Sequence, residues 1–308
     1  MKGLETFVDW FAGVGGFRLA GESSKLKCVG ACDNDKYARQ TYAARFGHEP
    51  EFSDAWDVIP SEVPDHDLFC GGFPCPAFSI AGKRQGFQDE RGQLIFAVGA
   101  VLEAKRPNYV LLENVLGLLT APVFEQGTAP VDGTAGWVFY RILEMLGDLG
   151  YTVQWHVLYS RHWVPQDRRR VYILASRREL PIPEVFPLFD FAEEMAGNVE
   201  RVHAAIGRVH SHQGGRVYGP NSIIPTLTAG DKGPFVHMND GRHLRLVTPL
   251  EKERLQGFPE EWTEGVSDSQ RMKQCGNAIT VQAATEVIRR LVECHGNQGK
   301  RLETEAIG

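Results

Sequence analysis

One cysteine in this 308-residue chain lies in a conformationally stiff segment, Gly71 to Ser79, with the sequence GGFPCPAFS. Proline stands on either side of Cys75. Because proline fixes φ and removes a backbone donor, neither flanking position suits a helix interior or a central strand. The run before it, DHDLFC from Asp65 to Cys70, is typical of a buried strand, so Cys75 is expected on a rigid loop at the carboxyl end of that strand. Ligands bind at that edge of open α/β sheets, and both a reactive thiol and a thiol that only fills space are compatible with this loop.

A glycine-rich turn follows the first expected strand, in the segment Asp9 to Phe17, DWFAGVGGF. Glycine lets the backbone turn sharply and approach a ligand closely. Asp33 ends the next strand, where a carboxylate can accept hydrogen bonds from both hydroxyl groups of a ribose. The third glycine of the dinucleotide motif is missing, which favours a ligand without a pyrophosphate, such as S-adenosylmethionine. Asp54, in FSDAW, could accept a hydrogen bond from an adenine amino group, and together these residues predict a nucleoside site.

Three further segments carry side chains that could take part in chemistry. Glu113, in ENV, ends the strand after the one that leads to Cys75. Arg168 and Arg170, in PQDRRR, are two apart at the start of a strand, so both side chains can point the same way. Asn277, in QCGNAIT, precedes the last helix and could contact a ligand. Considered one at a time, each segment has an ordinary interpretation: an exposed carboxylate for Glu113, a surface cluster for the arginines and a turn for Asn277.

The elements that must position these residues alternate along the first half of the chain. Strands are expected at residues 5–11, 27–33, 67–72, 108–115, 152–159 and 169–176, with helices at 36–45, 93–104 and 138–149. This order predicts a mostly parallel, doubly wound sheet covered on both faces, of the Rossmann-like kind. From Pro181 the chain becomes rich in Gly, His and Pro. Thr248 and Glu251 form a candidate capping box, and a last amphipathic helix is expected at 280–294.

These features predict a catalytic domain over residues 1–180, completed by 272–308, and a small second domain with a hinge over 181–271. Composition agrees with an ordinary soluble protein, since 43% of residues are hydrophobic and 23% charged. No apolar run approaches membrane-spanning length, and the six cysteines form no C-x-x-C pair, so neither a membrane nor a metal is expected. The net charge of −6 hides a run of six arginines against one acid at 161–178, which is compatible with a DNA-facing side.

In combination and order, the motifs resemble those of the DNA cytosine-5 methyltransferases. They are FAGVGGF, GGFPCPAFS, ENV, QDRRR, TPLEKERLQGFP and QCGNAI, and the resemblance covers the chain from Thr6 to about Ile288. The chain is most similar to compact bacterial and phage members of the HhaI type. The resemblance implies a domain that binds S-adenosylmethionine, a small target-recognition domain, and double-stranded DNA in the cleft between them. The chain is expected to be a monomeric enzyme in the cytoplasm of a bacterial or phage-infected cell. Restriction–modification is the expected setting, and the sequence leaves open whether a cognate restriction enzyme exists.

The resemblance implies a role for the stiff loop. A thiolate at Cys75 would attack C6 of a flipped-out cytosine and make C5 nucleophilic, and a rigid loop would hold it in line. Glu113 would act protonated at N3, and burial would raise its pKa in that direction. Arg168 would hold the base oxygen and orient Glu113, with Arg170 as a further catalytic residue.

Other positions follow from the same motif matching. The implied cofactor residues are Phe11, Gly13, Gly15, Asp33, Asn34, Asp54, Leu94, Asn277 and Ala278. The implied DNA-contacting residues are Ser79, Arg91, Gln213, Arg216 and Thr226. Asn34 stands where a close relative carries an aromatic residue, which leaves Phe11 as the main stacking face for adenine. Gln213, flanked by Gly214, is implied to fill the space that the flipped cytosine leaves.

Three alternative functions remain open from sequence. An RNA cytosine-5 methyltransferase of the same fold usually carries a Cys-Phe-Thr motif, and the sequence contains none. A DNA-binding homologue without catalytic activity would not need Cys75, Glu113 and Arg168 intact. A NAD enzyme would leave Cys75 unexplained. The sequence does not reveal the target site.

Overall fold

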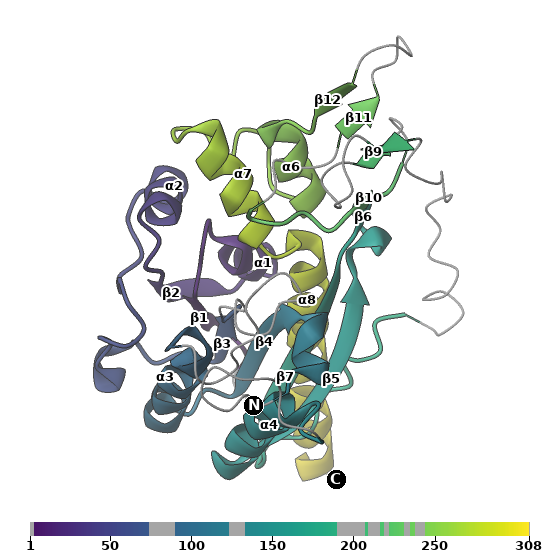
Figure 1. The fold of residues 1–308 in the computed structure, drawn as a ribbon. Helices are drawn as coiled ribbons and strands as arrows, with labels where there is room; N and C mark the ends of the chain where they lie inside the picture. The colour runs from purple at the N-terminus through teal and green to yellow at the C-terminus, as the bar shows by residue number, and fades with distance from the viewer. Residues whose placement is uncertain are drawn as a thin grey trace.

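The computed structural model describes residues 3–73, 90–122, 133–189, 207–208, 216–218, 222–230, 235–237 and 244–307. A six-stranded sheet forms its centre (Figure 1), in the order β2-β1-β3-β4-β7-β5. In chain order these strands are β1 (Thr6–Trp10), β2 (Lys27–Cys32), β3 (Leu68–Gly71), β4 (Tyr109–Val115), β5 (Tyr151–Tyr159) and β7 (Arg169–Arg177). Only β7 runs antiparallel to its neighbours, β4 and β5. The predicted mostly parallel sheet is therefore confirmed.

Helices cover both faces of this sheet, because successive strand residues point to opposite sides. The helices are α1 (Gly16–Ser23), α2 (Lys36–Phe46), α3 (Glu90–Lys105), α4 (Trp137–Asp148) and α8 (Val281–Ile307). On one face, Val110 and Leu112 of β4 pack in a core with residues of α3 and α4. On the other, Tyr109 and Leu111 pack with residues of α1 and α8. This arrangement confirms the doubly wound α/β architecture.

The region after the large sheet contains very short strands, which explains its weak periodicity. A four-stranded sheet has the order β12-β11-β9-β8, and β10 pairs with β6 in a separate two-stranded ladder. Their bounds are β6 (Gln166–Asp167), β8 (Gly207–Arg208), β9 (Arg216–Tyr218), β10 (Ile224–Pro225), β11 (Phe235–His237) and β12 (Leu244–Leu246). The domain boundaries expected at 180/181 and 271/272 stay a prediction.

Helices α6 (Pro249–Gln256) and α7 (Asp268–Asn277) lie between the small sheet and α8 in the chain. The expected capping box of α6 is confirmed, since Thr248 Oγ1 accepts from the Glu251 amide at 3.2 Å and Glu251 Oε2 accepts from the Thr248 amide at 2.8 Å. Helix α7 was not expected, and the last helix, α8, extends well beyond residue 294. Short 3₁₀ helices lie at η1 (Pro60–Glu62), η3 (Leu116–Thr120) and η4 (Ser160–His162).

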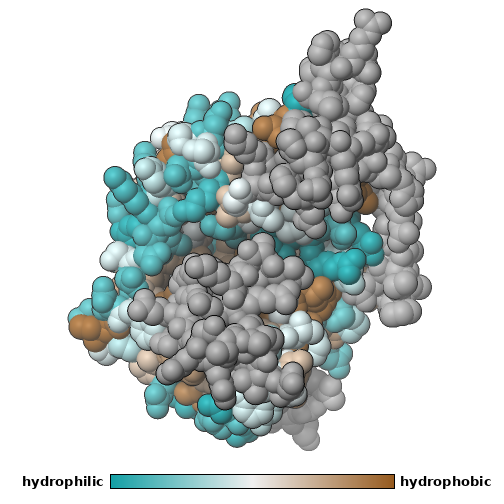
Figure 2. All heavy atoms as spheres, viewed as in Figure 1, coloured by the Kyte–Doolittle hydropathy of each residue, from teal (hydrophilic) through white to brown (hydrophobic). Residues whose placement is uncertain are grey.

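Helix α7 packs beside the start of α2. Gln274 Nε2 donates to the Tyr37 carbonyl at 2.8 Å, and Lys273 Nζ lies 2.6 Å from Asp35 Oδ2. Figure 2 shows that hydrophilic side chains predominate over α2 and α7 on this face of the molecule. The contact brings the end of α7, which carries Asn277, to the side of the sheet where β2 ends.

Candidate active site

The turn after β1 closes against the end of β2. Phe11 and Gly13 both have left-handed backbone conformations, with φ of 57° and 56°. Asp33 Oδ2 accepts a hydrogen bond from the Gly13 amide at 2.7 Å, and Oδ1 accepts one from the Asp35 amide at 2.8 Å. No described atom lies within 4 Å of the position that a Cβ on Gly13 would take. The glycine turn therefore borders open space beside a fixed carboxyl group.

These residues fit a nucleoside. A carboxylate offers about four lone-pair positions, so Asp33 can accept from two ribose hydroxyls in addition to the two amides. Burial raises its pKa, while the two backbone hydrogen bonds favour the charged form. Asp54 Oδ1 accepts from the Trp56 amide at 3.0 Å, so this carboxyl group is also held in place. Phe52, two residues before Asp54, forms a single parallel bridge with Cys32 at the end of β2, which keeps Asp54 near Asp33 in the fold.

The other cofactor residues lie where the chain turns or packs. Leu94 of α3 is buried and Asn34 is exposed directly after Asp33. Packing explains why glycine occupies position 15, because a Cβ there would lie 2.3 Å from Phe46 Cε2. Packing against Phe46, together with a φ of 86°, accounts for this glycine without a ligand.

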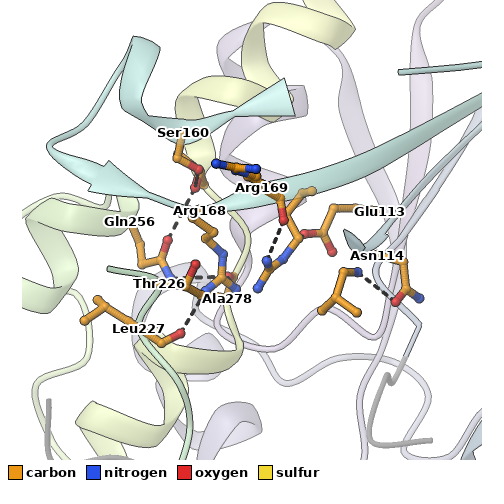
Figure 3. Close-up of polar contacts among 12 residues, drawn as sticks. Glu113, Asn114, Ser160, Arg168, Arg169, Thr226, Leu227, Gln256 and Ala278 are labelled. Atoms are coloured by element: carbon orange, nitrogen blue, oxygen red, sulfur yellow. Dashed lines mark hydrogen bonds and ion pairs between the residues drawn. The ribbon is translucent and has the colours of Figure 1, made fainter. Parts of the chain in front are cut away.

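A buried acid–base pair lies at the ends of the neighbouring strands β4 and β7, and Figure 3 labels its acid, Glu113. Arg170 Nε lies 3.0 Å from Glu113 Oε1, and the two side chains are only 12% and 10% exposed. Antiparallel pairing of β4 with β7 sets Arg170 opposite Val115, close to Glu113. Burial raises the pKa of Glu113, while Arg170 and, to a smaller extent, Arg168 oppose that shift. The raised pKa favours a carboxyl group that can hold a proton.

The segment that leads to Cys75 begins beside Glu113. A Cβ on Gly72 would lie 3.5 Å from Glu113 Oε2. Asn114 Nδ2 donates to the Phe73 carbonyl at 3.2 Å, which fixes the end of β3 against the end of β4. The positions of Cys75 and Ser79 lie outside the described residues.

Arg168 has a different position from the one expected. Its guanidinium donates to three backbone carbonyls, those of Leu227, Gly276 and Ala278, at 3.0, 3.2 and 2.7 Å. Figure 3 shows it extending toward Ala278 and Leu227. The expectation that Arg168 orients Glu113 is corrected, because the ion pair belongs to Arg170. Arg168 precedes β7 rather than lying within it, so the alternation of a regular strand does not set its direction.

Sequence reasoning missed two buried glutamines that surround Arg168. Gln166 Oε1 accepts from the Leu227 amide at 2.9 Å, and its Nε2 donates to the Leu255 carbonyl at 2.7 Å. Gln256 Nε2 donates to the Cys275 carbonyl at 2.6 Å. The position of Gln166 in the PQDRRR motif could have indicated its role from sequence. Gln256 could be predicted only to lie in a helix, with nothing in the sequence to indicate its contacts.

The expected DNA contacts are only partly described. Thr226 Oγ1 donates to the Asp167 carbonyl at 2.8 Å, which ties β10 to β6. For Arg91 and Arg216 the structure describes the backbone, in α3 and β9. Gln213 lies outside the described residues. In the described part of the chain no helix is long and apolar enough to cross a membrane. No group of three or more His, Cys, Asp or Glu side chains that could hold a metal occurs there either.

A mostly parallel sheet with one reversed strand, an open glycine turn held by Asp33 and a buried Glu113–Arg170 pair define an α/β protein with a candidate active site at one edge of the sheet. The family model for C-5 cytosine-specific DNA methylase matches residues 5–216 and 210–293. The chain is 33% identical to the type II methyltransferase M.HhaI of Haemophilus parahaemolyticus, covering 89% of this chain and 90% of the relative. It is 36% identical to M.NgoBI of Neisseria gonorrhoeae, covering 89% of each.

Solved structures agree on the fold. The Dnmt2 methyltransferase of S. pombe superposes with a TM-score of 0.69 at 20% identity, covering 94% of this chain and 98% of the other. A putative DNA modification methyltransferase encoded within an E. coli prophage gives a TM-score of 0.68 at 19% identity, covering 94% and 99%. The chain belongs to the C-5 cytosine-specific DNA methylase family. Its activity is methyl transfer to cytosine in DNA.

Proposed function

We propose that this enzyme methylates C5 of a flipped-out cytosine in one short double-stranded DNA sequence, through a covalent bond between Cys75 and C6. S-adenosylmethionine, when bound, would supply an electrophilic methyl group and leave as the neutral thioether S-adenosylhomocysteine. The observation that carries the proposal is the buried Glu113–Arg170 pair, which lies beside Gly72 at the start of the Cys75 loop. A neutral carboxyl group and a cation at that point suit a pyrimidine ring that must accept charge.

The residues divide the reaction into two balanced stages. The Cys75 thiolate forms a bond to C6 while Glu113 gives its proton to N3, so the electrons of the C5–C6 double bond become available at C5. Once C5 carries the methyl group, N3 returns its proton to Glu113. A base then removes the C5 proton, the double bond re-forms, and Cys75 leaves as a thiolate.

Arg170 supports both stages. A guanidinium close to Glu113 can hold the carbonyl oxygen of the base and offset negative charge that develops in the ring. A cation near Cys75 also favours the thiolate over the thiol. These roles require the ring to lie against the carboxyl ends of β3 and β4, outside a stacked duplex.

The cofactor is proposed to lie over the glycine turn. Asp33 would accept from the ribose hydroxyls and Asp54 from the adenine amino group, with Phe11, Gly13, Asn34, Leu94, Asn277 and Ala278 around the ligand. Ser79, Arg91, Gln213, Arg216 and Thr226 are proposed DNA contacts, with Gln213 inserted into the duplex.

Transfer of a labelled methyl group from S-adenosylmethionine to duplex DNA and to RNA tests the proposal. Label in DNA as 5-methylcytosine is expected, and bisulfite sequencing of DNA from a host expressing the chain would give the target sequence. Label that enters RNA and not DNA would favour the RNA enzyme, and no transfer to either would favour a homologue without catalytic activity. Cys75→Ser is expected to abolish transfer.

A further inference from the structure

One described segment, residues 222–230, links the small sheet region to the catalytic domain. Its strand β10 pairs in parallel with β6, with Ile224 opposite Gln166 and Pro225 opposite Asp167. The Ile224 amide donates to the Pro165 carbonyl at 3.0 Å, and Thr226 Oγ1 donates to the Asp167 carbonyl at 2.8 Å. The segment is thus fixed to the strand that leads directly into Arg168 and Arg170.

The same segment touches the C-terminal end of α7, where the helix finishes at Asn277 and turns at Ala278. A Cβ on Gly276 would lie 2.5 Å from the carbonyl carbon and oxygen of Thr228 and from the amide nitrogen of Ala229. These are backbone atoms, which cannot move aside as the end of a flexible side chain can. Gly276 is therefore a direct contact between the 222–230 segment and the turn proposed to contact the cofactor.

Arg168 joins these two segments a second time. One nitrogen, Nη1, donates to the Leu227 carbonyl, and the other, Nη2, donates to the carbonyls of Gly276 and Ala278. The residue is 2% exposed, so its charge depends on these carbonyls for compensation. A displacement of one segment relative to the other would take at least one of these acceptors away from a buried guanidinium. The two segments are expected to move together for that reason.

We propose that Arg168 and Gly276 are positioning residues that couple DNA binding to cofactor binding. DNA held by the 222–230 segment fixes Leu227 and Thr228, and these fix the Gly276–Ala278 turn against the cofactor. The proposal rests on the proposed function, which places DNA on Thr226 and the cofactor on Asn277 and Ala278. Linkage requires the effect to be reciprocal, so the cofactor strengthens DNA binding by the same factor.

Calorimetry with S-adenosylhomocysteine, which cannot donate a methyl group, measures this coupling in the full-length protein. The Kd for S-adenosylhomocysteine is measured for the protein without DNA and for the protein with a saturating duplex, which carries the site found by bisulfite sequencing. We expect DNA to lower the wild-type Kd by about 5- to 150-fold, the usual range for coupled sites. In Arg168→Met this ratio is expected to fall toward one. A purely structural role would weaken binding with and without DNA alike and leave the ratio unchanged.

Arg290→Met is the matched control, because Arg290 Nη1 also donates to backbone carbonyls, those of Val185 and Pro187, away from both segments. It is expected to keep the wild-type ratio. Gly276→Ala tests the same coupling through the backbone contact, and Arg168→Lys retains the charge if the methionine variant does not fold. A folded variant at Arg168 or Gly276 with the wild-type ratio would overturn the proposal, as would a wild-type ratio of one. Because these are binding measurements, their failure is distinct from a failure to methylate DNA.

Discussion

Asp9 is a buried carboxyl group in the strand that leads into the glycine turn, and its replacement by asparagine makes stability less sensitive to pH. Its Oδ2 accepts from the Arg18 amide at 3.0 Å, while Oδ1 has no hydrogen-bond partner among the described residues. Burial raises the pKa of Asp9 from 3.8 to about 8, with Asp33 adding to the shift in the same direction. An asparagine in the same position keeps an oxygen for the Arg18 amide and cannot ionise.

The sign and size follow from proton linkage. The unfolded chain releases the Asp9 proton near pH 4 and the folded protein keeps it until about pH 8, so stability falls as pH rises between these values. Each pH unit in that interval costs about 1.4 kcal/mol. From about pH 5 to about pH 7 the free energy of unfolding of Asp9→Asn is therefore expected to gain about 3 kcal/mol on wild type.

Urea unfolding of both proteins at these two pH values measures the difference, and contributions from other titrating groups cancel between them. Asp67→Asn is the matched control, since Asp67 Oδ2 accepts from the amides of Glu5 and Thr6 but is only half-buried. The control is expected to lose stability at both pH values without the relative gain. An Asp9→Asn difference that is the same at pH 5 and pH 7 would refute the reasoning.

Three further predictions concern the site. Glu113→Gln is expected to lower kcat by about 10²–10⁴-fold, with DNA binding little changed; wild-type kcat should decline as pH rises through the raised pKa of Glu113, because the protonated form is required. Asp33→Ala is expected to raise the Kd for S-adenosylmethionine, measured by calorimetry, since each lost charge-assisted bond is worth about 1.5–3 kcal/mol. Gly15→Ala is expected to destabilise by roughly 2–5 kcal/mol through left-handed strain and the clash with Phe46, and by less in a Phe46→Ala background. A wild-type kcat in Glu113→Gln would contradict the first expectation, and an unchanged Kd in Asp33→Ala would contradict the second. An equal loss of stability from Gly15→Ala with and without Phe46→Ala would contradict the third.

The sheet was predictable because its signals are local. The buried strand Tyr109–Val115 begins with four consecutive apolar residues, and the Thr248–Glu251 capping box depends on only four consecutive residues. Helix α7 was missed because its sequence, DSQRMKQCGN, is polar and its packing on α2 relies on hydrogen bonds such as Gln274 to Tyr37. Short strands such as Gly207–Arg208 are too brief to show a period of two.

The sequence was sufficient to name candidate site residues but not to assign the contacts between them. Strand ends place Glu113 and Asp33 at one edge of the sheet, and motif order supplied their roles. The partner of Glu113 could not be assigned, because Arg168 and Arg170 differ only in where the regular strand begins. Arg170, within the regular strand, contacts Glu113, whereas Arg168, before the strand, donates to carbonyls of distant segments. These contacts depend on tertiary packing and cannot be predicted from residue spacing.

The most direct test of the account uses a duplex in which 5-fluorocytosine replaces the target cytosine. Elimination of Cys75 requires removal of a proton from C5, and fluorine at that position prevents it. Wild-type enzyme with S-adenosylmethionine is therefore expected to form a denaturation-resistant complex with this duplex, and peptide mapping is expected to place the adduct on Cys75. Cys75→Ser is expected to form no such complex while it still binds the cofactor. A stable adduct in Cys75→Ser, or efficient methylation of DNA by that variant, would contradict the covalent role of Cys75.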